Sequence, residues 1–478
     1  QLDEDGNRLF KNTDSNGRFH SDWCSMIYSR LMLARNLLSD DGVIFISIGE
    51  EEIDNTKKML AEIFGESNEI SQISRVIKTA SNMGTFFTPS VDYILCFAKS
   101  INTTSRFKGD VDESLYKKIE TTGKRKGEKY RDDVAFFQSG LKHGGSRYPI
   151  VCPDGQRVNT PDNKPWRASE ATFLEWENNN MIVFKKTNTS PLIDEDTGEK
   201  ASWNLYTKSY LSDRKEIGTQ PRNIITDCIN RKGADLLRKM DIPFDFAKPV
   251  ELLYFLIKTI NSSDGIIMDF FSGSATTAHA VMQLNAEDGG HRKFIMVQLP
   301  EETAEDSEAF KAGYKNICEI GKERIRRAGA KIKEESPMTT QNLDTGFRVL
   351  KLDDTNMQDV YYTPAETDQQ MLSGFESNIK PDRTDLDLLF GCLLDWGLPL
   401  SMPYSSEQIE GVTVHTYNDG DLIACFDKAI PESVIKTIAK RQPLRVVFRD
   451  DSFADSPSKI NVSEIFKMLS PDTRVKVI

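Results

Sequence analysis

Two separate stretches of the chain alternate amphipathic helices with short, almost wholly apolar runs, and this alternation most restricts the possible fold. Residues 43–48 are apolar and rich in β-branched side chains, which is typical of a strand buried on both faces of a parallel sheet. Helices are predicted over residues 21–39 and 50–64, and a further strand over residues 93–98. Helices alternating with buried strands indicate the α/β class.

The same alternation returns after a long interruption. Helices are predicted over residues 250–260, 276–285 and 314–335, and buried strands over residues 265–270 and 294–299. With 478 residues, the chain is also too long for one ordinary core, so three to four domains are expected.

Between and after the α/β stretches the charge balance changes. Residues 104–147 hold eleven Lys or Arg against seven Asp or Glu, in a chain whose net charge is −12. Such a run is most often a solvated surface, although it also suits a local patch for nucleic acid. Residues 336–478 hold 14 Lys or Arg against 22 Asp or Glu, which makes them poor candidates for contacting phosphates.

Composition excludes several classes of protein. Neither a membrane-spanning run nor a secretory signal is visible, so we expect a cytoplasmic protein that does not enter a membrane. The seven cysteines are scattered and never spaced as Cys-x-x-Cys, which argues against a disulfide framework or a zinc site. The histidines show no ligand spacing, so we predict no metal.

The sharpest local signal is the segment DFFSGSATTA, residues 269–278, where a strand ends in small residues and opens directly into a helix. Small side chains allow backbone N–H groups to approach a ligand, and the helix N-terminus favours a negative group. The pattern therefore predicts a site for a nucleotide-like cofactor, although an ordinary tight strand-to-helix connection explains it equally well. Neither a dinucleotide fingerprint nor a Gly-Lys-Ser/Thr phosphate loop is present.

This segment resembles the S-adenosylmethionine loop of β-group amino-DNA methyltransferases, and residues 246–252, FAKPVEL, resemble their Lys-Pro element. Residues 20–23, 33–38, 41–48, 319–329 and 469–478 look like the modification subunit of type III restriction–modification systems. The resemblance implies a Rossmann-like methyltransferase sheet with an inserted DNA-recognition domain and a C-terminal α+β domain.

The resemblance also implies an order of domains. The target-base half would occupy residues 1–103, the recognition insert 104–245, the cofactor half 246–335, and a domain for dimerisation and docking 336–478. The cofactor would be S-adenosylmethionine. The residues expected to hold it are Lys248, Pro249, Asp269, Phe270, Phe271, Ser272, Gly273, Ser274, Thr276 and Gln298.

Two features depart from the family pattern. The tetrapeptide Asp-Pro-Pro-Tyr, which clamps the flipped adenine in the family, occurs nowhere in the chain and is expected upstream of residue 1. Its loss would remove the contacts that orient the target nitrogen and would leave a gap in the sheet beside Asp269. Ala275 stands where the family usually has glycine, so its methyl group either crowds the cofactor or demands a different backbone angle.

For the insert, the resemblance implies double-stranded DNA as partner. Base reading would fall to polar side chains such as Asn204, Arg222 or Asn223. His279, inside a predicted helix, is expected to be packed and not catalytic. The candidates for phosphate contacts are Lys124, Arg125, Lys126, Lys129, Arg131, Lys142 and Arg147.

The leading hypothesis is an adenine-N6 DNA methyltransferase subunit that pairs with a second modification subunit and docks a restriction subunit through its acidic end. Without the tetrapeptide we expect it to be inactive alone. The alternative is a non-catalytic recognition and assembly fragment of such a system. An α/β methyltransferase acting on RNA or a small molecule is a weaker third possibility.

Overall fold

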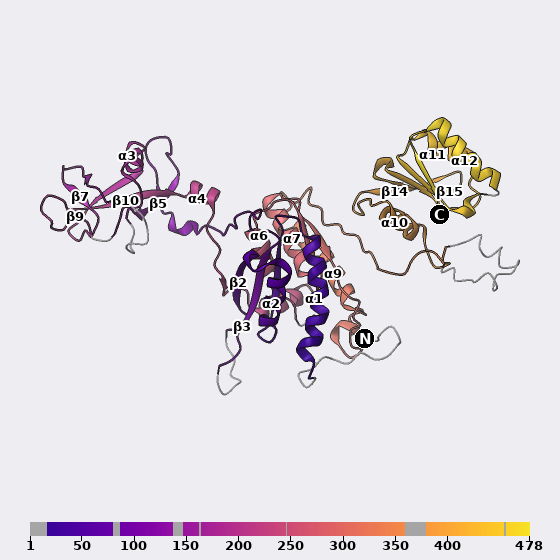
Figure 1. Ribbon diagram of the computed structural model, residues 1–478, viewed down its shortest axis with the longest axis horizontal. Helices are drawn as coiled ribbons and strands as arrows, with labels where there is room; N and C mark the ends of the chain where they lie inside the picture. The colour runs from indigo at the N-terminus through magenta and orange to yellow at the C-terminus, as the bar shows by residue number, and fades with distance from the viewer. Residues whose placement is uncertain are drawn as a thin grey trace. The chain divides into compact units, whose positions relative to one another are not determined.

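A computed structural model of the chain describes residues 17–79, 87–136, 147–161, 164–244, 246–358, 379–453 and 456–478 (Figure 1). By their internal contacts the residues form two compact units, which divide between Thr345 and Gly346. The first unit contains the two α/β stretches and the segment between them. Each unit is described in turn below.

The first α/β stretch builds a four-stranded sheet in the order β1-β3-β2-β11. Its central contacts join β1 to β3 and β3 to β2, both antiparallel, whereas β11 pairs with β2 in parallel. Helices α1 (Phe19–Leu37) and α2 (Ile53–Phe64) supply Leu31 and Leu60 to the core on this sheet. The strands are β1 (Val43–Ile48), β2 (Glu69–Val76), β3 (Val91–Ala98) and β11 (Ile224–Ile225).

The prediction of a parallel neighbour for residues 43–48 was wrong, since β1 pairs antiparallel with β3. An apolar, β-branched run reports that a strand is buried and not which way its neighbour runs. The α/β class itself is confirmed by the alternation of helices and strands in both stretches.

The second stretch forms a two-stranded parallel sheet, β12 (Ile266–Asp269) with β13 (Lys293–Met296). One face of this sheet packs on α6 (Val250–Thr259) and α7 (Thr276–Asp288), through Ile267 and Phe294. Helix α9 (Ile317–Glu335) packs along α7 (Figure 1). The remaining helices of this region are α5 (Asn230–Lys239) and α8 (Glu308–Lys311).

The opposite face of this sheet is open, which corrects the prediction of a fully buried strand at residues 265–270. Ile266 is 67% exposed and Met268 40% exposed on β12, and Ile295 is 46% exposed on β13. Within the described parts of the chain, no strand pairs with the second edge of β12. Burial of a short apolar run depends on what covers it, and the run alone does not reveal this.

The segment between the stretches folds on a second four-stranded sheet, ordered β4-β5-β10-β8, which we call the insert sheet. Its core centres on Trp166, which is 1% exposed and donates its indole N–H to the carbonyl of Tyr148 at 2.8 Å. Three short strands form a separate small sheet. The elements are β4 (Lys118–Ile119), β5 (Lys129–Val134), β6 (Ile150–Val151), β7 (Arg157–Asn159), α3 (Glu170–Asn178), β8 (Ile182–Lys186), β9 (Ile193–Asp194), β10 (Trp203–Tyr210) and α4 (Leu211–Ile217).

The second unit is a five-stranded mixed sheet in the order β14-β15-β16-β17-β18. Val414, Ile423, Val446 and Phe448 form its core with apolar residues of α11 and α12. The elements are α10 (Asp385–Asp395), β14 (Tyr404–Ile409), β15 (Val412–Tyr417), β16 (Leu422–Cys425), α11 (Glu432–Lys440), β17 (Arg445–Phe448), α12 (Ser456–Leu469) and β18 (Arg474–Val477).

Candidate functional site

The turn between β12 and α7 contains two residues in the left-handed backbone region. Gly273 has φ +49° and Ala275 has φ +58° and ψ +41°. The turn is closed by a hydrogen bond from the Ala275 N–H to the Ser272 carbonyl at 2.8 Å, and it is tied to the segment after β13 by one from the Ser272 N–H to the Val297 carbonyl at 3.2 Å. The backbone at the head of α7 is therefore held by hydrogen bonds within the protein.

Asp269 anchors both ends of this turn. Its carboxylate accepts hydrogen bonds from the backbone N–H of Phe271 at 3.2 Å and from the hydroxyl of Thr277 at 2.6 Å. Thr277 lies in the first turn of α7 and is buried. The acid that ends β12 thus holds the strand to the helix.

Gln298 reaches the same turn from the end of the second strand. Its side-chain oxygen accepts the backbone N–H of Gly273 at 2.7 Å, and its backbone carbonyl accepts a contact from the Cys318 thiol at 3.4 Å. The structure therefore brings Gln298 to the predicted loop, where it holds the glycine. Its contact with a cofactor stays a prediction.

The Lys-Pro element also meets this turn. Pro249 is buried and caps α6, and the hydroxyl of Thr276 lies 3.5 Å from the carbonyl of Lys248. A Cβ on Gly233 of α5 would stand 2.2 Å from the Ala247 carbonyl, so α5 fits against this backbone only because residue 233 is glycine. The Lys248 side chain itself is exposed.

The two phenylalanines diverge. Phe270 packs against the core of α1, α2 and β1, whereas Phe271 is 55% exposed. Their ring centroids are 5.3 Å apart. Of the two rings expected at the cofactor, Phe271 is thus the one that a planar ligand on the turn can contact.

The methyl group of Ala275 was expected either to crowd the cofactor or to demand a different backbone angle, and the structure bears on both. Its side chain is 2% exposed and faces Gly321 of α9, where an added Cβ would lie 3.5 Å from the Ala275 Cβ. The methyl group therefore points into the protein, and alanine here adopts the left-handed backbone that glycine usually occupies.

Arg324 is a residue of this site that the sequence interpretation missed. It is fully buried on the apolar face of α9, and its Nη1 donates to the Ser274 hydroxyl at 2.8 Å and to the Thr276 hydroxyl at 2.7 Å. The sequence did offer a signal of its burial, because Arg324 is spaced three or four residues from Ile320, Gly321 and Ala328 and so lies on the same face of the helix. It is easily overlooked, because α9 carries many charged residues on its other faces.

His279 is confirmed as a packed histidine. It is 6% exposed within α7, and burial together with the charge of Arg324 lowers its pKa to about 3. A neutral imidazole with such a low pKa is a poor proton acceptor near pH 7.

The basic residues of the insert divide into engaged and exposed groups. Arg125 forms two hydrogen bonds to Asp213, at 2.8 and 2.9 Å, and stacks on Tyr210. Arg131 pairs with Asp133 at 3.0 Å, and Arg147 donates to the Thr160 carbonyl at 2.8 Å. These three guanidinium groups already have protein partners.

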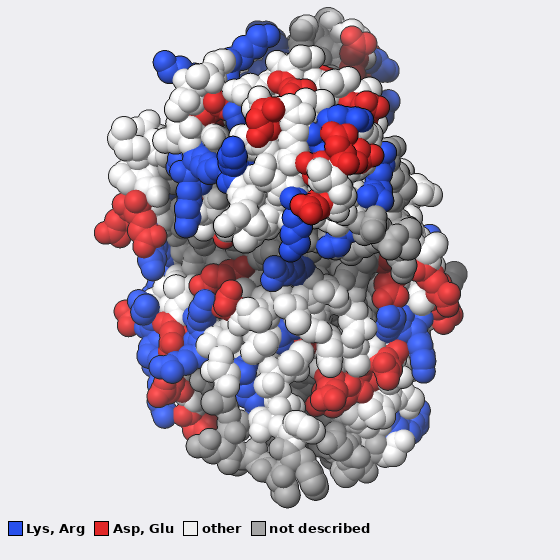
Figure 2. Space-filling view, turned by 90° about the vertical axis from the view of Figure 1, so that its left-hand side faces the viewer, with Lys and Arg blue, Asp and Glu red and all other residues white. Residues whose placement is uncertain are grey.

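Lys124, Lys126 and Lys129 are exposed on the same segment, so they remain candidates for phosphates. Lys142 lies outside the described residues. On the face drawn in Figure 2, Lys and Arg are interspersed with Asp and Glu and form no continuous basic stripe. Contacts of the insert with DNA stay a prediction.

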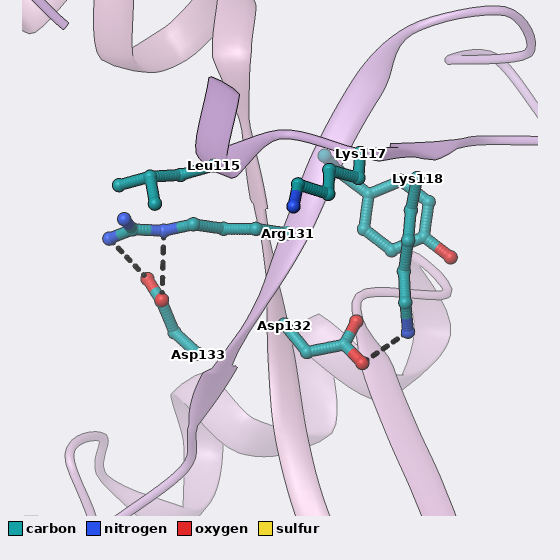
Figure 3. A pocket seen from close by; sticks show the side chains of 7 residues that line it. Leu115, Lys117, Lys118, Arg131, Asp132 and Asp133 are labelled. Atoms are coloured by element: carbon teal, nitrogen blue, oxygen red, sulfur yellow. Dashed lines mark hydrogen bonds and ion pairs between the residues drawn. The ribbon is translucent and has the colours of Figure 1, made fainter. Parts of the chain in front are cut away.

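A shallow cavity of about 420 Å³ lies on the insert beside β4 and β5. Asp132 forms ion pairs with Lys118 and with Lys185, and Arg131 faces Asp133 across the same surface (Figure 3). Burial raises the pKa of the Asp132 carboxyl, but hydrogen bonds from Lys118 and Lys185 lower it by more. The pKa of Asp132 therefore lies below its usual value. The lining residues are Leu115, Lys117, Lys118, Tyr130, Arg131, Asp132 and Asp133.

Within the described ranges, three or more His, Cys, Asp or Glu nowhere gather as metal ligands would. Among the helices that the structure describes, none is both long and apolar enough to cross a bilayer.

The curated relatives of the chain include type III Mod subunits and type II methyltransferases. The chain is 35% identical over 335 residues to the StyLTI Mod subunit of a type III restriction–modification enzyme of Salmonella typhimurium, a match that covers 69% of this chain and 48% of that protein. It is 28% identical over 457 residues to the EcoPI Mod subunit of Escherichia phage P1, which covers 87% of this chain and 66% of the relative. The chain thus spans about half to two thirds of the length of these relatives.

Among solved structures, the M1.HpyAVI–SAM complex aligns over 64% of this chain and 84% of that chain, with 13% identity and a TM-score of 0.31. The family model N6_N4_Mtase, described as DNA methylase, matches residues 4–311. Because this match spans more than half of the 478 residues, the chain belongs to the N6_N4_Mtase family of DNA methylases.

Proposed function

We propose that this chain carries the cofactor site and recognition insert of an adenine-N6 DNA methyltransferase, the modification subunit of a type III restriction–modification system. The observation that carries the proposal is the hydrogen-bonded turn of residues 269–277, in contact with the Lys248–Pro249 backbone, in a chain that belongs to the DNA methylase family. The Mod names of its relatives support the subunit class.

The residues at the turn suit S-adenosylmethionine. A Cβ built on Gly273 meets nothing within 4 Å, so the turn leaves open space for a ligand on that side. The exposed ring of Phe271 offers a surface for the adenine, and the head of α7 favours the negative end of the molecule. When bound, this cofactor supplies the activated methyl group.

Holding the target base would require groups that the chain does not contain. The tetrapeptide Asp-Pro-Pro-Tyr is absent from its 478 residues, and it is the element that would hold the flipped adenine amine and stack on the base. Proximity and alignment of the amine with the methyl carbon are the main sources of rate for such a transfer. We therefore propose that the chain binds cofactor but transfers methyl groups only when a clamp is supplied.

The wider assignments are proposals of the same kind. The target-base half is placed at residues 1–103, the insert at 104–245, the cofactor half at 246–335 and the docking domain at 336–478. The expected partners are double-stranded DNA, a second modification subunit and a restriction subunit, in the cytoplasm. The acidic composition of residues 336–478 supports a role in protein contacts more than in DNA contacts.

Calorimetry with S-adenosylhomocysteine and a labelled methyl-transfer assay test the proposal together. The 478-residue chain is compared with the same chain fused to the Asp-Pro-Pro-Tyr segment of a relative. We expect both to bind the nucleoside and only the fused chain to methylate adenine. Absence of binding by both chains would contradict the assignment, and methylation by the unfused chain would contradict the requirement for a clamp.

The alternative, a non-catalytic recognition and assembly protein, is favoured by one observation, the missing tetrapeptide. It predicts that the fused chain also fails to methylate while still binding DNA or the restriction subunit.

A further inference from the structure

Arg324 lies directly beneath the turn at the head of α7. Its Nη1 is 2.8 Å from the Ser274 hydroxyl, 2.7 Å from the Thr276 hydroxyl and 3.4 Å from the Ser274 carbonyl. Gly321, one turn earlier in α9, faces the Gly273 carbonyl and the Ala275 side chain, so the helix approaches the turn closely. The guanidinium thus contacts the turn from its buried side.

The charge of this guanidinium has no counter-ion among the described residues. Arg324 is 0% exposed, its Nη1 contacts are hydroxyl and carbonyl groups only, and its Nε and Nη2 have no hydrogen-bond partner in the described part of the chain. Burial lowers its pKa to about 10, so the group is still protonated near pH 7. Burying a charge without a partner is costly, which calls for an explanation.

The position of this charge makes the cost larger. The N-terminus of α7 carries the positive end of the helix dipole, and Arg324 adds a full positive charge next to it. Two positive sources therefore meet at Ser274 and Thr276, on the turn where the Gly273 side is open. An anionic group bound on the outer side of the turn would relieve this repulsion.

We propose that Arg324 is a positioning residue whose unneutralised charge, acting through Ser274 and Thr276, selects a carboxylate on the ligand at this turn. The inference rests on the proposed function, in which the ligand is S-adenosylmethionine. The carboxylate of its amino-acid end is the group selected. Arg324 does not touch the ligand, since it is fully buried below the turn.

A purely structural arginine makes a different prediction. If Arg324 only held the turn in shape, its loss would weaken every ligand of the turn by the same factor. If its charge acts on the carboxylate, its loss weakens only ligands that carry this group. Comparing two ligands that differ in the carboxylate alone separates these cases.

The experiment measures the Kd of S-adenosylhomocysteine and of its decarboxylated analogue by calorimetry, on the full chain and on Arg324→Met. We expect the variant to bind S-adenosylhomocysteine roughly ten- to a hundred-fold more weakly, because the carboxylate loses its attraction to a nearby charge in a partly screened medium. The analogue should lose less than about threefold. Arg326→Met is the matched control, an exposed arginine on the same helix, and should leave the ratio of the two Kd values unchanged.

Arg324→Lys covers the case in which the methionine variant does not fold. It keeps the charge but makes fewer hydrogen bonds, so we expect lower thermal stability with the ratio of Kd values preserved within about threefold. An equal loss of both ligands in the methionine variant, or a collapsed ratio in the lysine variant, would overturn the proposal. If the parent chain binds neither ligand, the proposed function itself fails, which is a distinct result.

Discussion

The carboxylate of Asp269 accepts a 2.6 Å hydrogen bond from the hydroxyl of Thr277, eight residues later in the chain. This bond spans the whole turn, from the end of β12 to the first turn of α7. Because Thr277 is 4% exposed, little water is available to replace it. Removing this hydrogen bond therefore tests how much the stability of the turn depends on side-chain contacts in addition to backbone contacts.

Thr277→Val should destabilise the chain by about 1–3 kcal/mol, because it leaves a carboxylate oxygen of Asp269 without its donor. Thr259→Val is the matched control, since Thr259 is also 4% exposed in a helix but its hydroxyl donates to a backbone carbonyl, that of Phe255. We expect it to cost less than about 1 kcal/mol. Urea unfolding measures both. Equal losses of unfolding free energy in the two variants would show that the hydrogen bond to Asp269 contributes no more stability than one to a backbone carbonyl.

Gly273→Ala should impair ligand binding far more than stability. Its φ of +49° makes alanine strained by about 1 kcal/mol, and the new methyl group would project into the open space of the turn. Gly289→Ala provides the control, with φ +69° and equally open surroundings at the other end of α7. Both variants should lose similar stability in thermal melts. Only Gly273→Ala should weaken S-adenosylhomocysteine binding, by about tenfold or more. Equal affinity of the two variants for this ligand would show that the ligand does not bind at this turn.

Stability should fall below about pH 6.5 because of His279. Its pKa is lowered to about 3 in the folded chain, so the unfolded chain takes up a proton that the folded chain does not. The loss from this residue reaches about 2 kcal/mol at pH 5.

His279→Gln tests this, because it removes the titrating group from the first turn of α7. Between pH 7 and pH 5 the variant should lose about 2 kcal/mol less unfolding free energy than the parent. The exposed His291, changed to Gln, is the control and should follow the parent. A pH profile of His279→Gln that matches the parent would place the acid sensitivity elsewhere.

Lys124→Gln and Lys126→Gln should weaken DNA binding to the same extent for specific and unrelated duplexes. Each lost phosphate contact should reduce the slope of log K against log salt by about 1. Arg125→Gln should act differently, because that guanidinium is held by Asp213 and stacked on Tyr210, so its loss should appear in thermal stability. Unchanged salt slopes in both lysine variants would move the phosphate contacts away from this segment.

Local patterns were enough to find the strand, turn and helix of the site. The helix predicted at residues 276–285 begins at Thr276 as expected and runs to Asp288. The long helix predicted from residue 314 begins at Ile317, where Asn316 provides the cap. The Lys248–Pro249 element, which the family resemblance singled out, lies against the turn, with the Lys248 carbonyl 3.5 Å from the Thr276 hydroxyl.

Tertiary contacts account for what the sequence did not reveal. Apart from its register with the buried residues of α9, nothing local marks Arg324 as buried, because it stands among charged residues and its partners lie 48 and 50 residues away. The direction of the neighbour of β1 and the exposure of Ile266 depend on strands distant in the chain. The partner of Arg125 likewise comes from far along the chain, since Asp213 lies in the helix that follows the insert sheet.

Among the described residues, nothing covers one face of the β12–β13 sheet or pairs with the second edge of β12, and this bears on how the protein behaves in solution. The side chains of Ile266, Met268 and Ile295 are apolar and exposed, and the backbone groups on the second edge of β12 have no strand partner in the described part of the chain. Such an edge can pair with an extended segment of another molecule. At high concentration the molecules should therefore self-associate, and dilution should reverse the association. Light scattering across a dilution series would show this, and it sets the concentration at which every titration above should be run.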